Sequence, residues 1–161
     1  MGHPTVNPIT SFFVGHIVEV YFVYGLAFFV LGVVLALAAR RESELPIVRA
    51  LAPLALFGLL HGAHEWVEMF QKIAQQYSGR IPGPVEEALR IGLLIFSFVC
   101  LLVFGAQMHR REGTPARQGW AAVWVLLLLW LVAWGISLVA LRPNALDAIY
   151  LADVWARYLI A

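Results

Sequence analysis

The segment from Phe57 to Glu68 is where this sequence concentrates side chains capable of chemistry. Its ionisable residues are His61, His64, Glu65 and Glu68. Residues three and four apart share one face of a helix, so we expect these two imidazoles and two carboxylates to lie together within about two turns. The surrounding residues are apolar, and an ionisable group inside a membrane costs roughly several kcal/mol unless it finds partners in the bundle interior. The segment therefore predicts an inward-facing polar cluster.

A second histidine–glutamate pair, His16 and Glu19, lies in the first apolar stretch. Counting ~1.5 Å per residue from the arginines that flank each stretch puts Glu68 roughly 28 Å and Glu19 roughly 31 Å above the same boundary. We therefore expect both pairs in the outer half of a membrane, at overlapping depths, and name all six residues as candidates for ligand or proton sensing.

The first interpretation of this cluster is structural. Arg90 and Arg157 fall in the same outer layer and could pair with the carboxylates, while the histidines could bond across helices to groups such as Ser97. Interhelical hydrogen bonds of this kind contribute roughly 0.6–2 kcal/mol each, which is enough to fix how helices pack. Asp153 lies four residues before Arg157 and predicts an ion pair on one helix face.

A metal centre is a second interpretation. His61, His64 and Glu65 offer imidazole and carboxylate ligands suited to Zn²⁺ or Cu²⁺, and His16 or Glu19 could add a ligand from another helix. The spacing His-x-x-His-Glu differs from the zincin pattern, in which the two histidines lie four apart around the glutamate. Zinc and copper are therefore candidates, and the sequence identifies no cofactor.

Haem and proton sensing are two further interpretations. A b-type haem needs two axial histidines at matching depth, and the helical count places His16 well above His61, which argues against haem. Proton sensing needs a histidine, whose ordinary pKa is about 6.5, beside a carboxylate or in a buried position. The residues alone leave the structural, metal and proton interpretations open.

Composition indicates the setting of these residues. The chain is 61% hydrophobic and 13% charged, whereas a soluble domain carries roughly 25% charged residues. The net charge of +1 gives no electrostatic reason for a nucleic-acid partner. No Ser/His/Asp arrangement, phosphate-binding loop or pair of cysteine ligands occurs, so we expect no catalytic site in this chain.

Four apolar stretches have the ~20 residues that a helix needs to cross a ~30 Å hydrocarbon layer. A fifth segment, 147–161, is half a span that we expect to continue beyond Ala161. Spanning segments must satisfy their own backbone hydrogen bonds and are therefore helical. We predict an all-α transmembrane bundle forming one domain over 1–161, with full spans at about 14–39, 48–70, 88–108 and 119–141.

The connections between these stretches predict the orientation and one packing contact. Residues 40–49 and 110–117 each hold three arginines, and no Lys or Arg precedes the first span. Arginine-dense loops stay in the cytoplasm, so we expect the N-terminus outside. Gly58 and Gly62 lie four apart, a spacing typical of closely packed membrane helices.

Four stretches, 22–29, 39–45, 57–66 and 152–158, carry a resemblance to a family. In order and spacing the chain resembles the N-terminal membrane region of bacterial sensor histidine kinases and related diguanylate cyclases. The resemblance implies a dimeric input domain in the bacterial inner membrane that serves two-component signalling through a cytoplasmic module outside these residues. The rival hypothesis is a small integral-membrane subunit of a larger complex, whose cluster is structural or binds metal, haem or quinone. Residues singled out by the resemblance are His61, His64, Glu65, Trp66, Asp153 and Arg157.

Overall fold

The protein is an assembly of helices, as the sequence predicted. The computed structural model describes residues 7–40, 46–109, 116–141 and 144–160, and these contain no strand. The all-α fold class is therefore confirmed. The elements are α1 (Pro8–Gly15), α2 (Ile17–Ala39), α3 (Pro46–Ser78), α4 (Pro84–His109), α5 (Ala116–Leu141), α6 (Ala145–Trp155) and a π-helical turn η1 (Ala156–Ile160).

Three helices are long and apolar enough to cross a membrane: α2, α4 and α5. They correspond to the predicted spans 14–39, 88–108 and 119–141. The fourth predicted span, 48–70, lies inside α3, which has 33 residues but does not join the apolar group because polar side chains interrupt it. The fifth segment forms α6, of 11 residues, followed by η1. The described residues thus give three apolar spans, and not the four with a partial fifth that we predicted.

Half of the arginines that predicted the orientation, Arg41, Arg110 and Arg111, lie outside the described residues. Arg40 is exposed at the end of α2, and Arg49 and Arg117 lie near the starts of α3 and α5. The outside location of the N-terminus therefore stays a prediction.

Local sequence explains where several helices begin and end. α3 and α4 start at Pro46 and Pro84, and proline suits the first helical position because the missing N–H would have no intrahelical partner there. α3 is followed by Gly79 at a φ of 63°, a left-handed conformation that glycine adopts without strain. At the start of α6, the Asn144 side chain accepts a hydrogen bond from the backbone N–H of Asp147 at 2.9 Å.

Glycines allow α2 and α3 to pack with their backbones in near contact. A Cβ atom added to Gly62 would lie 2.7 Å from the carbonyl oxygen of Gly25, and one added to Gly58 would lie 2.8 Å from the backbone nitrogen of Gly32. A Cβ on Gly25 would also meet the ring of Trp66 at 2.7 Å. The close packing predicted from Gly58 and Gly62 is therefore confirmed, and it sets how α2 and α3 face each other.

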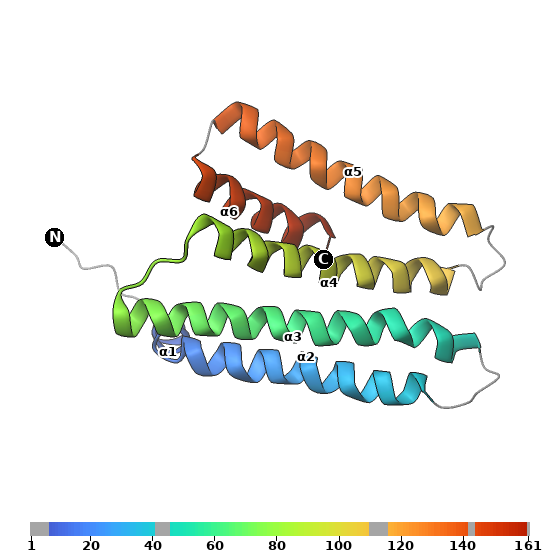
Figure 1. The fold of residues 1–161 in the computed structure, drawn as a ribbon, viewed down its shortest axis with the longest axis horizontal. Helices are drawn as coiled ribbons and strands as arrows, with labels where there is room; N and C mark the ends of the chain where they lie inside the picture. The colour runs from blue at the N-terminus through green and yellow to red at the C-terminus, as the bar shows by residue number, and fades with distance from the viewer. Residues whose placement is uncertain (1–6, 41–45, 110–115, 142–143, 161) are drawn as a thin grey trace.

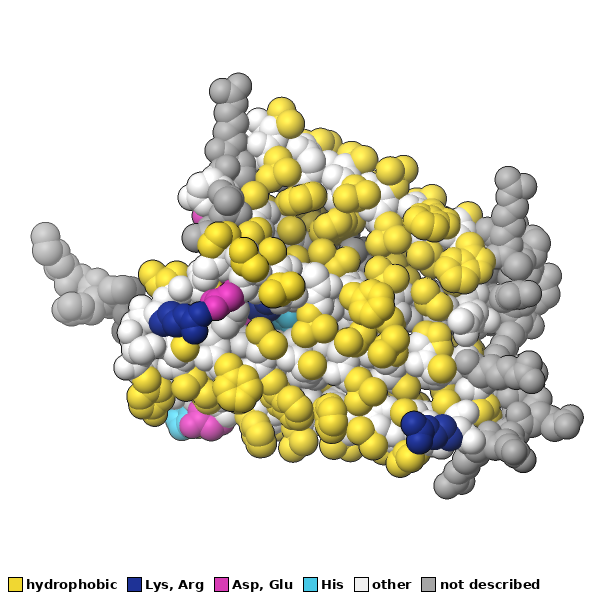
Figure 2. Space-filling model, viewed as in Figure 1, with side chains coloured by type: hydrophobic (Ala, Val, Ile, Leu, Met, Phe, Trp, Pro, Cys, Tyr) yellow, Lys and Arg dark blue, Asp and Glu magenta, His cyan; other side chains and the backbone are white. Residues whose placement is uncertain are grey.

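The remaining helices build outward from this pair. Figure 1 shows α4 beside α3 and α5 at the far edge, with α6 between α4 and α5 near the α3–α4 connection. The buried core is formed where α3, α4, α5 and α6 meet, and it includes Phe57, Leu94, Phe98, Trp130 and Ala152. The outer surface is mostly apolar, with charged groups confined to a few places (Figure 2), as expected of helices that face lipid.

Candidate functional site

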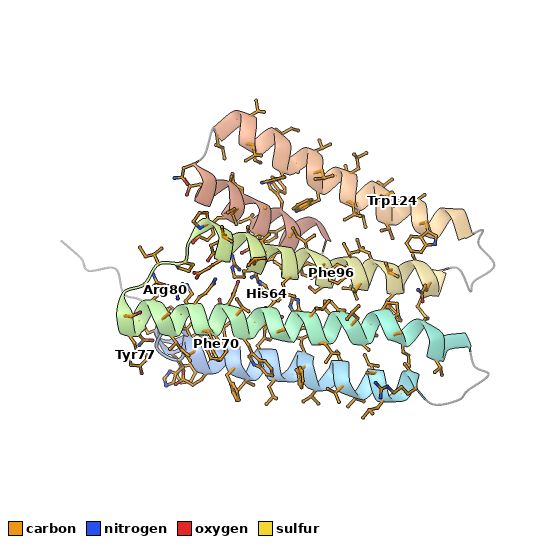
Figure 3. The ribbon with its side chains drawn as sticks, in the orientation of Figure 1. His64, Phe70, Tyr77, Arg80, Phe96 and Trp124 are labelled. Atoms are coloured by element: carbon orange, nitrogen blue, oxygen red, sulfur yellow. The ribbon has the colours of Figure 1, made fainter. Side chains whose placement is uncertain are left out.

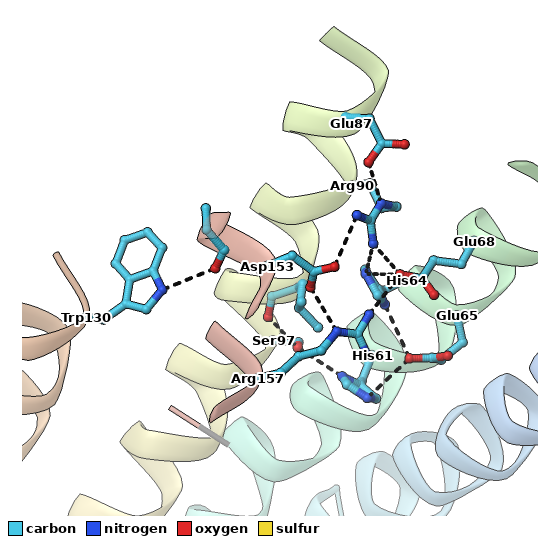
Figure 4. A network of polar contacts seen from close by, with 12 residues as sticks. His61, His64, Glu65, Glu68, Glu87, Arg90, Ser97, Trp130, Asp153 and Arg157 are labelled. Carbon is cyan, nitrogen blue, oxygen red and sulfur yellow. Dashed lines mark hydrogen bonds and ion pairs between the residues drawn. The ribbon is translucent and has the colours of Figure 1, made fainter. Parts of the chain in front are cut away.

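A cluster of nine polar residues lies inside the bundle, where α3 meets α4 and α6–η1 (Figure 4). Seven of the nine are buried, and His64 and Glu65 are 0% and 2% exposed. The predicted group on α3 therefore faces inward, as Figure 3 also shows for His64 between α3 and α4. We refer to these residues as the polar cluster: His61, His64, Glu65, Glu68, Glu87, Arg90, Ser97, Asp153 and Arg157.

Arg90 on α4 joins three elements of the structure. Its Nε donates to Glu87 at 2.9 Å on the same helix, and its Nη2 donates to Asp153 on α6 at 3.3 Å. Its Nη1 donates to Glu68 on α3 and lies 3.5 Å from Nε2 of His64. Arg90 is 5% exposed, so the protein encloses it almost completely. Arg90 therefore holds α3, α4 and α6 together through charged hydrogen bonds.

Arg157, in the π-helical turn η1, makes a second connection to α3. Its Nη2 donates to Oε1 of Glu68 at 2.8 Å, and its Nε donates to Asp153 at 2.8 Å. The predicted pair between Asp153 and Arg157 is thus confirmed. Glu68 consequently accepts from two guanidiniums that belong to different parts of the chain, Arg90 on α4 and Arg157 on η1.

The partners of His61 determine which of its nitrogens carries a proton. Ser97 Oγ donates to the Leu94 carbonyl at 2.7 Å, so it accepts from His61 Nδ1, 3.3 Å away. In a neutral His61 the other nitrogen, Nε2, then has no proton, although it lies 3.6 Å from Oε1 of Glu65. Two acceptors in this position repel each other unless a proton lies between them. A proton shared between His61 and Glu65 would remove this repulsion.

His64 has a complete set of partners in its neutral form. Its Nε2 accepts from Arg90, and its Nδ1 lies 3.3 Å from Glu65 Oε1, to which it donates. Its Nε2 is also 3.6 Å from Glu68. A second proton on Nε2 would place a donor where Arg90 already presents one, so protonation of His64 would oppose the contact with Arg90.

The charges of the polar cluster do not balance. It holds four carboxylates and two guanidiniums, so with neutral histidines two negative charges are in excess. Uncompensated charge in a low-dielectric interior is costly. The excess equals the number of histidines in the cluster, so protons on the histidines or carboxylates can cancel it.

A polar cavity of about 270 Å³ adjoins the polar cluster near the α3–α4 connection. Glu68, Glu87, Arg90 and Asp153 line it, together with the polar side chain of Tyr21 on α2. A cavity of this size with several polar partners can hold water. Four members of the polar cluster are therefore in reach of this cavity.

Two of the predicted sensing residues, His16 and Glu19, do not join the polar cluster. Nδ1 of His16 donates to the carbonyl of Phe12 at 2.9 Å, and its ring stacks on that of Phe12. Glu19 is exposed and lines a separate surface groove with Lys72. The predicted depth did not fix rotation about the helix axis: Glu19 precedes Gly25 by six residues, about 120° around α2 from the face that packs on α3.

The proposed metal ligands come together but are engaged with other groups. Nε2 of His64 accepts from Arg90, so the lone pair that a metal would need on this imidazole is already used, and Nδ1 of His61 donates to Ser97. Among the described residues, no group of three or more His, Cys, Asp or Glu side chains could hold a metal ion. The metal hypothesis therefore has no geometric support in this part of the chain.

Sequence reasoning missed one member of the polar cluster, Glu87. It is 3% exposed and pairs with Arg90 three residues along α4. The same i, i+3 spacing that identified the residues of α3 was present here and could have identified it. The pairing of Arg90 and Arg157 with the carboxylates, and the bond between His61 and Ser97, are confirmed as predicted.

Within the described residues, then, the arrangement is a buried network of imidazoles, carboxylates and guanidiniums with an excess of negative charge, able to bind protons and to hold three helical elements together. Every buried side-chain nitrogen or oxygen in this part of the chain has a hydrogen-bond partner. No protein-family model, no curated protein and no solved structure matches this chain.

Proposed function

We propose that this chain is the sensory input domain of a bacterial signal-transduction protein, embedded in the cytoplasmic membrane with its N-terminus outside. The resemblance to sensor histidine kinases and diguanylate cyclases supports this assignment. In this proposal α3 also crosses the membrane, and its polar residues are tolerated because they face α4 and η1 instead of lipid. α6 and η1 form a partial fifth crossing, two copies associate, and catalysis belongs to a separate cytoplasmic module.

The contact of Glu68 with both Arg90 and Arg157 is the observation that carries the proposal. It ties the C-terminal segment, through which the resemblance would route a signal, to α3 at a point lined by histidines. A change of protonation in the polar cluster therefore acts directly on the position of η1 against α3.

The sequence of events follows from the hydrogen bonds. A proton taken up between His61 and Glu65 removes one excess negative charge. A further proton on Nε2 of His64 opposes Arg90 and turns His64 into a donor toward Glu68, which then competes with the two arginines. Breaking a buried ion pair costs about 3–5 kcal/mol, comparable to the roughly 5.5 kcal/mol that separates the two extremes of a fully switched equilibrium. The free energy of breaking one of these ion pairs is therefore large enough for the polar cluster to act as a switch.

A distance measurement tests the proposal. Spin labels at Tyr77→Cys on α3 and Tyr158→Cys on η1, both at exposed positions, report this separation in a Cys100→Ala background in lipid nanodiscs. We expect the distance distribution to shift between about pH 8 and about pH 5, the range over which histidine titrates. The shift should disappear in the double variant His61→Gln/His64→Gln. His16→Gln is the matched control, since that histidine lies outside the polar cluster, and it should respond as the parent does.

The second candidate function is that of a small integral-membrane subunit whose polar cluster fixes helix packing. The complete satisfaction of the buried polar atoms among the described residues favours it. Under this alternative the double histidine variant would lower the thermal stability, while the distance between the labels would not depend on pH in any variant. A quinone, metal or haem carried by such a subunit would require binding groups beyond this cluster.

A further inference from the structure

A second cavity, of about 530 Å³, lies in the groove between α3 and α4. Its volume falls within the roughly 300–1,000 Å³ typical of small-molecule sites. Phe70 and Arg80 lie near the α3–α4 connection (Figure 3), and both line this groove. Its wall is mostly apolar and includes Val67, Phe70, Ala74, Pro82, Leu89 and Leu93.

The groove borders the polar cluster, because Arg90 belongs to both. Arg90, Gln71 and Pro82 line both this groove and the polar cavity, so they lie between an apolar space and a polar one. In the space-filling view, a small patch of basic and histidine side chains is visible in the hollow between α3 and α4 (Figure 2). Gln71 is the uncharged polar residue of the lining and can both donate and accept.

The charges around the groove select among lipid-soluble ligands. Arg90 is already paired with Glu68, Glu87 and Asp153, so an anionic head beside it would meet three carboxylates. Arg80, at the mouth, is paired with Glu86. Neither arginine is a free cation, which disfavours a phosphate or a fatty-acid carboxylate. A neutral head that accepts hydrogen bonds is compatible with both.

We propose that this groove binds a lipid-soluble quinone, with its ring beside Phe70 and Arg90 and its apolar tail along Leu89 and Leu93 toward the lipid. A quinone is neutral, planar and carries two carbonyl acceptors, which suits the donors of Arg90 and Gln71. A quinol oxygen can also accept from the guanidinium, but its O–H then needs an acceptor that Arg90 does not offer, so we expect the oxidised form to bind more tightly. The inference deepens the proposed sensory function, on which it rests for its physiological meaning, by naming a ligand class.

Equilibrium binding of tritiated decylubiquinone to the chain in phosphatidylcholine nanodiscs tests the site. We expect saturable binding at one site per chain, weakened about tenfold or more by Leu89→Trp, which fills the groove from an exposed position. Leu128→Trp on α5 is the matched control, because it makes the same exchange at an exposed leucine outside the groove, and it should change the affinity by less than about twofold. Decylubiquinol should bind several-fold more weakly than the quinone.

Three results would overturn the proposal: no saturable binding, equal effects of Leu89→Trp and Leu128→Trp, or displacement of the quinone by oleate at equal concentration, which would make the groove a general lipid site. Val67→Trp repeats the block from α3, so the test survives if one variant fails to fold, and thermal melting of each variant checks this. Because binding is measured without any signalling readout, it can fail while the pH-dependent distance change persists, and the reverse.

Discussion

The two sides of α3 are built in opposite ways. Toward α2, backbones meet through Gly25, Gly32, Gly58 and Gly62, and the described residues make no ion pair there. Toward α4 and η1, the contact is a network of charges. Contacts between backbones have one geometry, whereas a charged contact changes with the number of bound protons. We therefore expect α2 and α3 to move as one unit, with the change on the other side of α3.

Replacing Arg90 should produce the largest effect on this comparison. Arg90→Gln leaves Glu87 without its counter-charge and removes one of two from Glu68 and Asp153, so we expect the free energy of unfolding to fall by about 3–5 kcal/mol. Denaturation in mixed micelles would measure it. Arg80→Gln is the control, since its pair with Glu86 is exposed and should contribute less than about 1 kcal/mol. Equal losses from both substitutions would show that the network is not the main contact.

A larger residue in place of a glycine should disrupt the contact between α2 and α3 for steric reasons. Gly62→Ala places a Cβ atom 2.7 Å from the carbonyl of Gly25, which should cost about 1–3 kcal/mol and separate α2 from α3. Gly92→Ala on α4 is the control, because nothing lies within 4 Å of its added Cβ, and it should stabilise the helix by about 0.5–1 kcal/mol. Thermal melts of the two variants should therefore shift in opposite directions, and shifts of the same sign would contradict this account.

Two glutamates one turn apart sharpen the account of the charged side. Glu68→Gln weakens hydrogen bonds from two guanidiniums and should destabilise by about 1.5–3 kcal/mol. Glu65→Gln has only histidine partners and removes one excess negative charge, so its effect should stay within about 1 kcal/mol. The same denaturation measurement compares them. A larger loss of stability from Glu65→Gln than from Glu68→Gln would contradict the inferred excess of negative charge.

The smallest expected effect lies between α5 and α6. Nε1 of Trp134 donates to the Ala148 carbonyl at 3.0 Å, and Trp134→Phe removes that bond while keeping most of the ring. We expect a loss of about 0.5–1.5 kcal/mol in thermal melts. Trp124→Phe, at a position 67% exposed, should change the stability less.

Residue type and spacing predicted the chemistry of the site better than they predicted which residues belong to it. The ionisable residues of α3, the two arginines and Ser97 were identified because spacings of three and four fix which side chains share a face. His16 and Glu19 were misplaced because the residue count gives height and not rotation, and the rotation of α2 depends on glycine contacts with α3. α3 did not qualify as an apolar span because the residues that form the site also lower its hydropathy. The groove beside Arg90 could not be predicted, since it depends on how α3 and α4 pack.

The coupling between Glu68 and Arg157 tests the central claim most directly. A double-mutant cycle with Glu68→Gln and Arg157→Gln, measured by unfolding in mixed micelles, gives the interaction free energy of this pair. The account predicts a coupling above about 1 kcal/mol at about pH 8 that falls markedly by about pH 5, as protons enter the polar cluster. A coupling that is negligible at the higher pH, or that stays constant across the range, would contradict it.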